Sequence, residues 1–228
     1  ADGPAGLRIT PQCEVCTTAW PCATLLASTW NPALVERVGT AGAEEVKENN
    51  IAVWLTPAVN IHRNPLCGRN FEYYSEDPLL AGKMGAAMVR GIQSQHIAAA
   101  VKHFACNNQE DNRMGSDSIV SERTIRELYL KGFELAVKES QPLSIMTSYN
   151  LINGVHAANN YDLCTEVARN EWGFGGAIMT DWTTTERDDS CTASGCMRAG
   201  NDLVMPGCFG DHNNMKKELE AGTLKLED

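Results

Sequence analysis

Short apolar runs alternate with longer segments of helical periodicity along most of this chain, and this alternation restricts its fold more than any other feature. Strand-like runs cover 51–60, 98–105, 143–150, 176–182 and 202–207, with 23–26 as a sixth candidate. Helical patterns cover 31–50, 77–92, 121–137, 163–172 and 215–221, with one further helical segment ending at 199. Because the connections are too long for hairpins, the pattern predicts βαβ units and a parallel sheet.

Two parallel folds fit such a pattern. A doubly wound nucleotide-binding sheet carries a glycine-rich phosphate loop after its first strand, and the loop 61–76 lacks one. We therefore predict an α/β fold of the (β/α)8 TIM-like barrel type. Such a barrel typically needs about 250 residues. The chain has 228 residues, so we expect a barrel that is truncated or incomplete in this chain. No linker marks a second domain within 1–228.

Composition and charge exclude several partners. Hydrophobic residues make up 43% and charged residues 21%, which is ordinary for a globular protein in water. The net charge is -10 and the lysines and arginines are scattered, so we expect no nucleic-acid partner. No apolar run is long enough to cross a bilayer, so we expect no membrane contact.

The nine cysteines are odd in number and spread along the chain, which favours reduced thiols over a disulfide framework. Together with the absence of any Asn-x-Ser/Thr acceptor, this favours a cytoplasmic location over a periplasmic or secreted one. Cys13 and Cys16 have the spacing of half a zinc site, but no second pair completes it. We therefore expect no metal.

Polar side chains cluster where the predicted strands end. The set comprises Arg69, Glu72, Lys102, His103, Tyr149, Asn150, Asp181 and Trp182, and Asp2 is a further candidate. In a barrel of parallel strands the carboxyl ends all open on one face. Residues far apart in the sequence are therefore predicted to line one pocket.

Each of these residues also has a plainer interpretation. Asp181 suits the N-cap of the next helix, which taken alone is the better interpretation. Arg69 and Glu72 fit a local ion pair of small energetic value. Tyr149 fits a core phenol with a satisfied hydroxyl. Because several predicted strands end in polar side chains, a common pocket explains the whole set better than these separate interpretations do.

The predicted pocket has a definite chemical character. Asp2, Arg69, Lys102 and His103 carry strong hydrogen-bonding groups that suit vicinal hydroxyls. Trp182 offers a flat apolar face on which a sugar ring can stack. No cysteine or serine has the setting of an activated nucleophile. The natural ligand is a neutral polyol that needs no cofactor, with Asp181 as nucleophile for its anomeric carbon.

Several long motifs identify a family. They are 2–8 (DGPAGLR), 68–78 (GRNFEYYSEDP), 102–104 (KHF), 108–110 (NQE), 112–114 (NRM), 148–150 (SYN), 180–182 (TDW) and 200–206 (GNDLVMP). The chain resembles, nearly from end to end, the N-terminal domain of glycoside hydrolase family 3. The resemblance is closest to the β-glucosidase branch of that family.

The resemblance implies a role for each site residue. Asp181 matches the catalytic nucleophile, which forms a covalent glycosyl-enzyme. The residues that match those holding the sugar are Asp2, Arg69, Lys102, His103, Arg113 and Tyr149, and Trp182 matches an aromatic wall. We also expect Glu72 to brace Arg69 and Met146 to line the pocket floor. The implied activity is retaining, exo-acting hydrolysis of terminal β-D-glucosyl residues from small β-glucosides or cello-oligosaccharides.

The acid/base residue is not among these motifs. Family members acting on N-acetylglucosamine carry Pro-Gly after Lys-His and then an Asp-x-His dyad, whereas Phe104, Ala105 and Cys106 follow Lys102–His103 here. The resemblance therefore implies a glutamate from an α/β sandwich domain or chain outside these residues. The alternatives are a β-xylosidase or arabinofuranosidase of the same family, or a non-catalytic sugar-binding remnant. Homo-oligomer formation stays open.

Overall fold

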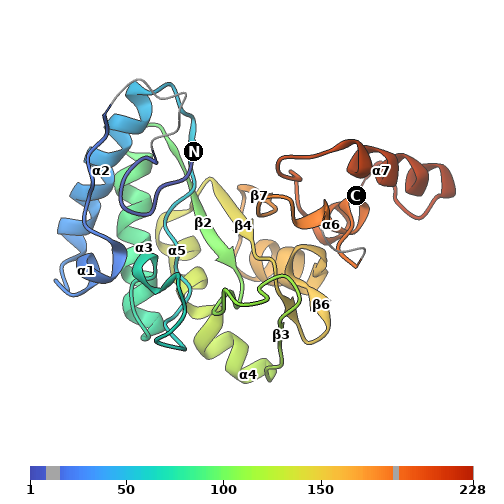
Figure 1. The fold of residues 1–228 in the computed structure, drawn as a ribbon, viewed down its shortest axis with the longest axis horizontal. Coiled ribbons are helices and arrows are strands. Elements are labelled where there is room, and N and C mark those ends of the chain that lie inside the picture. Colours follow the sequence, from blue (N-terminus) through green and yellow to red (C-terminus); the bar gives the residue numbers. More distant parts are fainter. Residues whose placement is uncertain (9–15, 187–189, 228) are drawn as a thin grey trace.

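A four-stranded parallel sheet lies at the centre of the computed structural model, which describes residues 1–8, 16–186 and 190–227. The strands are ordered β1 (Val53–Trp54), β2 (Ala98–Phe104), β4 (Ser144–Thr147) and β7 (Ala177–Met179) (Figure 1). All three strand pairings are parallel. The predicted parallel sheet built from alternating strands and helices is thereby confirmed.

Helices occupy most of the chain between and after the strands. Their bounds are α1 Ala23–Ala27, α2 Pro32–Glu48, α3 Pro78–Gln93, α4 Glu122–Thr124, α5 Lys131–Ser140, α6 Ala193–Ala199 and α7 Phe209–Ala221. Two π-helical segments span Ile125–Tyr129 and Asp162–Glu171, and short 3-10 turns span Asn70–Glu72, Ala157–Asn159 and Thr184–Glu186. Figure 1 shows α2, α3 and α5 on one side of the sheet, and α6 and α7 beyond β7.

Local sequence explains where the two long helices begin. The Asn31 side chain accepts a hydrogen bond from the Leu34 N–H at the start of α2. The Asp77 side chain accepts from Leu79 and Leu80 at the start of α3. A proline follows each cap, where its missing N–H costs nothing. These starts agree with the predicted ones.

A single large apolar cluster joins the helices to the sheet. Phe104 at the end of β2 packs against Phe133 of α5, with ring centroids 5.1 Å apart, and against Trp172 at 5.8 Å. Val89 of α3 and Ile145 of β4 are fully buried in the same cluster. Burial of these side chains holds the strands in register and so fixes where their polar ends lie.

The sequence-based element boundaries were wrong in several places. Segment 23–26 is a helix, because short apolar runs do not distinguish the two states. The run 51–60 contributes only β1 and two bridges from Ala58, to Tyr73 and to Lys102, since Pro57 cannot donate to a ladder. The run 202–207 contributes only a bridge from Leu203 to Met179. Helix α7 begins at Phe209 instead of Met215.

A second, small sheet was not predicted. It joins β3 (Asp117–Ser118), β5 (Leu151–Ile152) and β6 (Val155–His156). Asn153 and Gly154 form the turn between β5 and β6 with positive φ at both positions. Asn-Gly is the preferred sequence of such a turn, so the hairpin was recognisable from the sequence.

The barrel does not close within the described residues, where β1 and β7 end the sheet. This agrees with the predicted incomplete barrel. The cysteines of the described ranges are free thiols. Cys13, which with Cys16 has the spacing of half a zinc site, lies outside the described residues. Among the described helices, none combines the length and apolar character that a bilayer span requires.

Helices α2 and α3 touch through glycine, which makes their contact sensitive to a single methyl group. A Cβ on Gly91 would lie 2.1 Å from the Glu36 carbonyl oxygen and 2.9 Å from the Thr40 nitrogen, both rigid backbone atoms. We expect Gly91→Ala to lower the free energy of unfolding by about 2 kcal/mol. Urea unfolding measures this. Gly175→Ala, where an added Cβ meets nothing within 4 Å, is the matched control and should change stability far less.

Candidate active site

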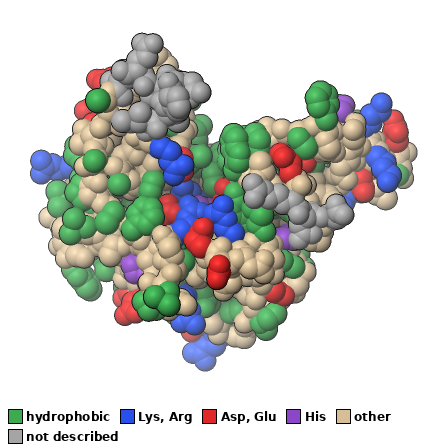
Figure 2. All heavy atoms as spheres, viewed as in Figure 1, with side chains coloured by type: hydrophobic (Ala, Val, Ile, Leu, Met, Phe, Trp, Pro, Cys, Tyr) green, Lys and Arg blue, Asp and Glu red, His purple; other side chains and the backbone are tan. Residues whose placement is uncertain are grey.

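A cavity of about 930 Å³ opens where β2, β4 and β7 end. The side chains predicted to act on or bind the sugar all line it, namely Asp2, Arg69, Lys102, His103, Arg113, Tyr149, Asp181 and Trp182. Asn150, which was also expected at this pocket, does not line it, because its side chain is buried and donates to the Ala105 carbonyl. Glu72 and Met146 line it too. Figure 2 shows basic and acidic side chains gathered in the middle of the viewed face, between the part that carries the N-terminal helices and the part that carries α6 and α7.

Lys102 and His103 are consecutive residues of β2, yet both face the cavity. The pairing register of β2 with β4 shifts between Val101 and Phe104, which breaks the usual alternation of side chains. Asn60 holds the strand end from the neighbouring segment. Its side-chain oxygen accepts from the His103 N–H at 2.7 Å, and its amide nitrogen donates to the His103 carbonyl at 2.9 Å.

Asp2 and Lys102 form an ion pair that links the start of the chain to β2. The Lys102 Nζ donates to Asp2 Oδ1 at 2.8 Å, and Arg8 lies 3.0 Å from Asp2 Oδ2. Burial by itself would raise the pKa of Asp2, but Lys102 and Arg8 outweigh it and hold the pKa below its ordinary value. Asp2 is therefore an anion at neutral pH.

Arg69 comes from the loop after β1 and is held by carboxylates. Its Nε pairs with Glu72 Oε1 in a short contact, as the three-residue spacing predicted. Glu72 is nearly inaccessible, and its other oxygen lies 3.8 Å from Lys102 Nζ. Glu110 lies 3.7 Å from Arg69 and 3.2 Å from Arg113. The sequence also fitted a local Arg69–Glu72 ion pair of small energetic value. The pair is indeed local, but it is largely buried at the cavity.

Asp181 lies two residues after the end of β7 at Met179, and its two carboxylate oxygens have different surroundings. Oδ1 accepts from the Trp182 N–H at 2.7 Å. Oδ2 is buried, lies 3.8 Å from His103 Nε2 and has no hydrogen-bond partner among the described residues. The side chain thus bonds its immediate neighbour and does not reach the second or third N–H that an N-cap would engage.

Burial shifts the pKa values of Asp181 and His103 at the centre of the cavity. It raises the pKa of Asp181 above the ordinary carboxyl value, although the Trp182 N–H, Lys102 and Arg69 oppose the shift. Burial also holds the pKa of His103 well below 6.5, and the neighbouring cations Arg69, Lys102 and Arg113 act in the same direction. His103 is therefore neutral at physiological pH and can donate or accept a hydrogen bond without adding charge.

The remaining wall of the cavity combines aromatic and apolar groups. The Tyr149 hydroxyl donates to the Trp182 carbonyl at 2.8 Å, and the Arg113 guanidinium lies 4.5 Å above the Tyr149 ring. Trp182 is 55% exposed, which leaves its indole face available at the mouth of the cavity. Met146 is buried at the cavity wall.

Several lining residues were not predicted from the sequence, namely Phe71, Glu110, Thr183, Leu203 and Met205. Only Glu110 left a usable signal, because it precedes Arg113 by three residues, the same spacing that linked Arg69 to Glu72. The apolar members Phe71, Leu203 and Met205 lie in a short 3-10 turn or in loops, where no periodicity indicates the direction of a side chain.

The neutral state of His103 predicts a pH-dependent stability. In the unfolded chain His103 takes up a proton as the pH falls through about 6.5, whereas the buried ring does not. The free energy of unfolding should therefore fall by about 1.4 kcal/mol per pH unit below 6.5 from this residue. Urea unfolding at pH 7.5 and 5.5 of the parent and His103→Gln isolates the effect. Equal pH dependence in both proteins would contradict it.

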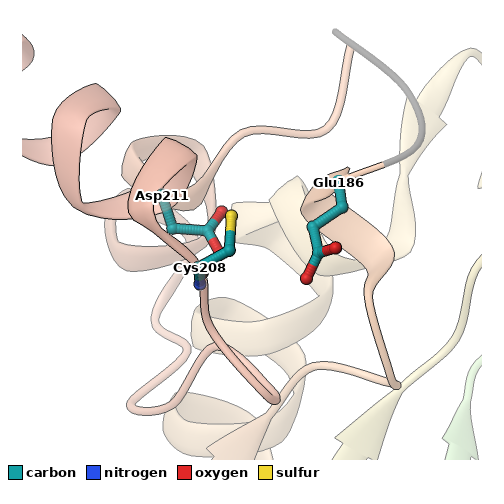
Figure 3. A group of neighbouring side chains, drawn as sticks. All are labelled: Glu186, Cys208 and Asp211. Carbon is teal, nitrogen blue, oxygen red and sulfur yellow. Dashed lines mark hydrogen bonds between the residues drawn. The ribbon is translucent and has the colours of Figure 1, made fainter.

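A second group of metal-ligating side chains lies apart from this cavity. Figure 3 shows Glu186, Cys208 and Asp211, whose ligand atoms lie within 4.8 Å of one another. Asp211 is already engaged, because its Oδ2 accepts from the Cys208 N–H and caps helix α7. Helix capping accounts for the contact between Asp211 and Cys208, since Asp in the first helical turn is favoured there.

The chain is similar to known proteins along almost its whole length. Residues 11–227 match the Glycosyl hydrolase family 3 N terminal domain. Beta-glucosidase A of Butyrivibrio fibrisolvens is 54% identical over 227 residues, which are 100% of this chain and 26% of that protein. The exo-alpha-(1->6)-L-arabinopyranosidase of Bifidobacterium longum is 47% identical over 219 residues, 92% of this chain and 28% of that protein.

Solved structures show the same relation. Beta-glucosidase 3B from Thermotoga neapolitana in complex with glucose superposes with a TM-score of 0.93 at 50% identity, and the match covers 100% of this chain and 33% of that one. The chain spans about a quarter to a third of the length of these relatives. From the matched family domain and the identities along its whole length, the chain belongs to glycoside hydrolase family 3.

Proposed function

We propose that this chain provides the nucleophile and the sugar-binding pocket of a retaining, exo-acting β-glucosidase. Asp181 would attack the anomeric carbon of a terminal β-D-glucosyl residue and form a covalent glycosyl-enzyme. The proposal covers residues 1–228 as one incomplete barrel domain whose acid/base residue is supplied by another domain or chain. Small β-glucosides and cello-oligosaccharides are the proposed substrates.

The arrangement of the Asp181 carboxylate carries the proposal. One oxygen is fixed by the Trp182 N–H, and the other is buried at the cavity wall without a hydrogen bond among the described residues. A nucleophile needs such a free oxygen held in one orientation. Lys102 and Arg69 favour its ionised form, although burial keeps its pKa raised. Burial leaves this oxygen weakly solvated, which favours attack by its ionised form.

The surrounding groups fit a neutral sugar. Lys102, Arg69 and Arg113 present cationic donors, and Asp2 presents an anionic acceptor for a hydroxyl pair. His103 adds a neutral ring beside the nucleophile. The cavity volume of about 930 Å³ exceeds what one sugar ring needs, and Trp182 at the mouth is suited to stack on the sugar or its leaving group.

The other carboxylates of the described cavity are poorly suited to act as the acid. Asp2 pairs with Lys102, Glu72 with Arg69, and Glu110 with both arginines. A cation beside a carboxylate favours its ionised form, whereas a general acid must carry a proton. A retaining mechanism needs a second carboxyl about 5 Å from the first. This supports an acid from a segment outside the described residues, such as the proposed α/β sandwich domain.

The mechanism follows from these roles. Asp181 attacks the anomeric carbon while the external acid protonates the leaving oxygen, through a transition state with oxocarbenium character. The acid, now a base, deprotonates a water molecule that displaces Asp181. Two inversions at the same carbon release glucose with retained configuration. The cationic residues hold the sugar hydroxyls through both steps.

A second candidate substrate class is a pyranoside without a hydroxymethyl group. The Bifidobacterium longum relative, named for an L-arabinopyranosyl substrate, is 47% identical to this chain. Polar groups that hold ring hydroxyls do not by themselves separate glucose from such a sugar. A panel of p-nitrophenyl glycosides with β-D-glucosyl, β-D-xylosyl, α-L-arabinopyranosyl and α-L-arabinofuranosyl groups would rank these substrates by kcat/KM.

The proposal is tested by trapping the covalent intermediate. A 2-deoxy-2-fluoro-β-glucoside with a good leaving group slows both steps, and the full-length protein that carries this chain should gain the mass of one fluoroglucosyl group. Peptide mapping should find the label on Asp181. Retained glucose binding in calorimetry without turnover or labelling would instead identify a sugar-binding remnant.

A further inference from the structure

Glu110 lies between two arginines of the cavity, and neither the family motifs nor the comparisons give it a role. Its carboxylate is 3.7 Å from Arg69 Nη1 and 3.2 Å from Arg113 Nη1. Arg69 and Arg113 come from different loops, the first after β1 and the second after β2. Glu110 is thus the shared anion that joins these two loops at the pocket.

Arg113 forms its ion pair with Glu110. Among the described residues, Glu110 is the one carboxylate within ion-pair distance of Arg113. The Arg113 side chain is about one-third exposed, and its guanidinium lies 4.5 Å above the Tyr149 ring. Without Glu110, the cation–π contact is the one remaining contact of this guanidinium with the described residues, and water would compete for the group.

The same contacts continue to the nucleophile. Arg113 covers Tyr149, the Tyr149 hydroxyl donates to the Trp182 carbonyl, and the Trp182 N–H donates to Asp181 Oδ1. The series consists of one cation–π contact at 4.5 Å and two hydrogen bonds, at 2.8 Å and 2.7 Å. A change in the orientation of Arg113 therefore alters the packing of the residue that supports the Trp182 backbone.

Arg69 is held from both sides, by Glu72 and by Glu110. Removing the Glu110 charge would leave two guanidinium groups facing each other without the anion between them. Repulsion in a partly buried site is stronger than in water. Since Arg69 stays fixed by the buried Glu72, Arg113 is the group that would move away.

We infer that Glu110 is a positioning residue that holds Arg113 against Tyr149 and fixes its distance from Arg69. The inference rests on the proposed function, because it assigns to Arg113 a contact with the sugar. Glu110 does not touch the reacting atoms. Its effect on the reaction passes through Arg113.

The test compares Glu110→Gln with Glu134→Gln in the full-length protein. Glu134 is a matched control, because it also bridges two cations, Lys131 at 2.9 Å and Lys138 at 2.7 Å, on helix α5 away from this cavity. We expect E110Q to lower kcat/KM for p-nitrophenyl β-glucoside by roughly tenfold to a hundredfold. E134Q should leave it unchanged, and both variants should keep the parent circular dichroism spectrum.

A double-mutant cycle with Arg113→Met separates positioning from a general structural effect. If Glu110 acts through Arg113, the E110Q/R113M protein should lose little more kcat/KM than R113M alone. Independent, additive losses would overturn the inference, as would an E110Q protein with the kinetics of the parent. Glu110→Asp, which keeps the charge, should recover part of the loss.

Glucose affinity, measured by calorimetry, tests the positioning role of Glu110 separately from the proposed hydrolytic function. A parent protein that binds glucose without hydrolysing glucosides would overturn the proposed function. Weaker glucose binding in E110Q, with the same non-additivity toward R113M, would still support the positioning role in that case. Unchanged glucose binding in E110Q and R113M would overturn it.

Discussion

Asp181→Asn should abolish glucoside hydrolysis while leaving the protein folded. Asparagine keeps the shape of the side chain and an oxygen for the Trp182 N–H, but it cannot form the glycosyl ester. We expect kcat to fall by at least about a thousandfold, which is ordinary for the loss of a covalent nucleophile. Initial rates on p-nitrophenyl β-glucoside measure the loss.

The free energy of unfolding, unlike the activity, should not fall on Asp181→Asn substitution. The fold raises the pKa of Asp181, so its anion is less favourable in the folded state than in the unfolded chain. At neutral pH the neutral amide removes that cost, and the free energy of unfolding should stay the same or rise. Asp111→Asn, at an exposed position outside the cavity lining, is the matched control. A D181N protein with more than a tenth of the parent activity would refute the nucleophile assignment.

Arg69→Met should damage both binding and stability. The guanidinium is the closest partner of Glu72, whose side chain is only 2% exposed. After the substitution, Lys102 at 3.8 Å is the remaining cation near that buried carboxylate. We expect the free energy of unfolding to fall by about 3 kcal/mol, because an uncompensated buried charge is costly. Glucose affinity should fall by roughly a hundredfold with the loss of a charged donor.

Pairing Arg69→Met with Glu72→Gln tests the physical cause. Neutralising the buried carboxylate should restore much of the stability, yet glucose affinity should stay low because the donor is still missing. Urea unfolding and calorimetry report the two quantities separately. Arg123→Met breaks an exposed pair with Glu127 and should change stability by less than about 1 kcal/mol. Equal effects of R69M and R123M would contradict the role of burial.

The motifs alone were sufficient to recognise the family and to list the polar pocket residues. Lys102–His103, Tyr149 and Asp181 directly follow apolar runs, and a parallel sheet has only one edge at which such ends can meet. Helix starts at Asn31 and Asp77 were also readable, since a cap acts over three or four neighbouring residues. These features depend on local sequence and on the topology that it implies.

Other features depended on contacts between distant segments. The sequence did not indicate that Glu110 would join Arg69 to Arg113, because loop conformation decides that distance. Nor did it limit the strand at 51–60 to two residues, or reduce 202–207 to one bridge. Strand pairing depends on two backbone segments at once, and a single apolar run does not define its partner.

Asp181 illustrates the division between sequence and structure. The sequence by itself determined that a carboxylate follows a buried run and that the motif around it is that of glycoside hydrolase family 3. Only the tertiary structure decided between a helix cap and a free oxygen. In the folded chain Oδ2 is buried beside His103, and Oδ1 accepts a hydrogen bond from the adjacent Trp182 N–H. The physical reason is that the protonation and the contacts of a carboxylate depend on groups that folding brings from other strands.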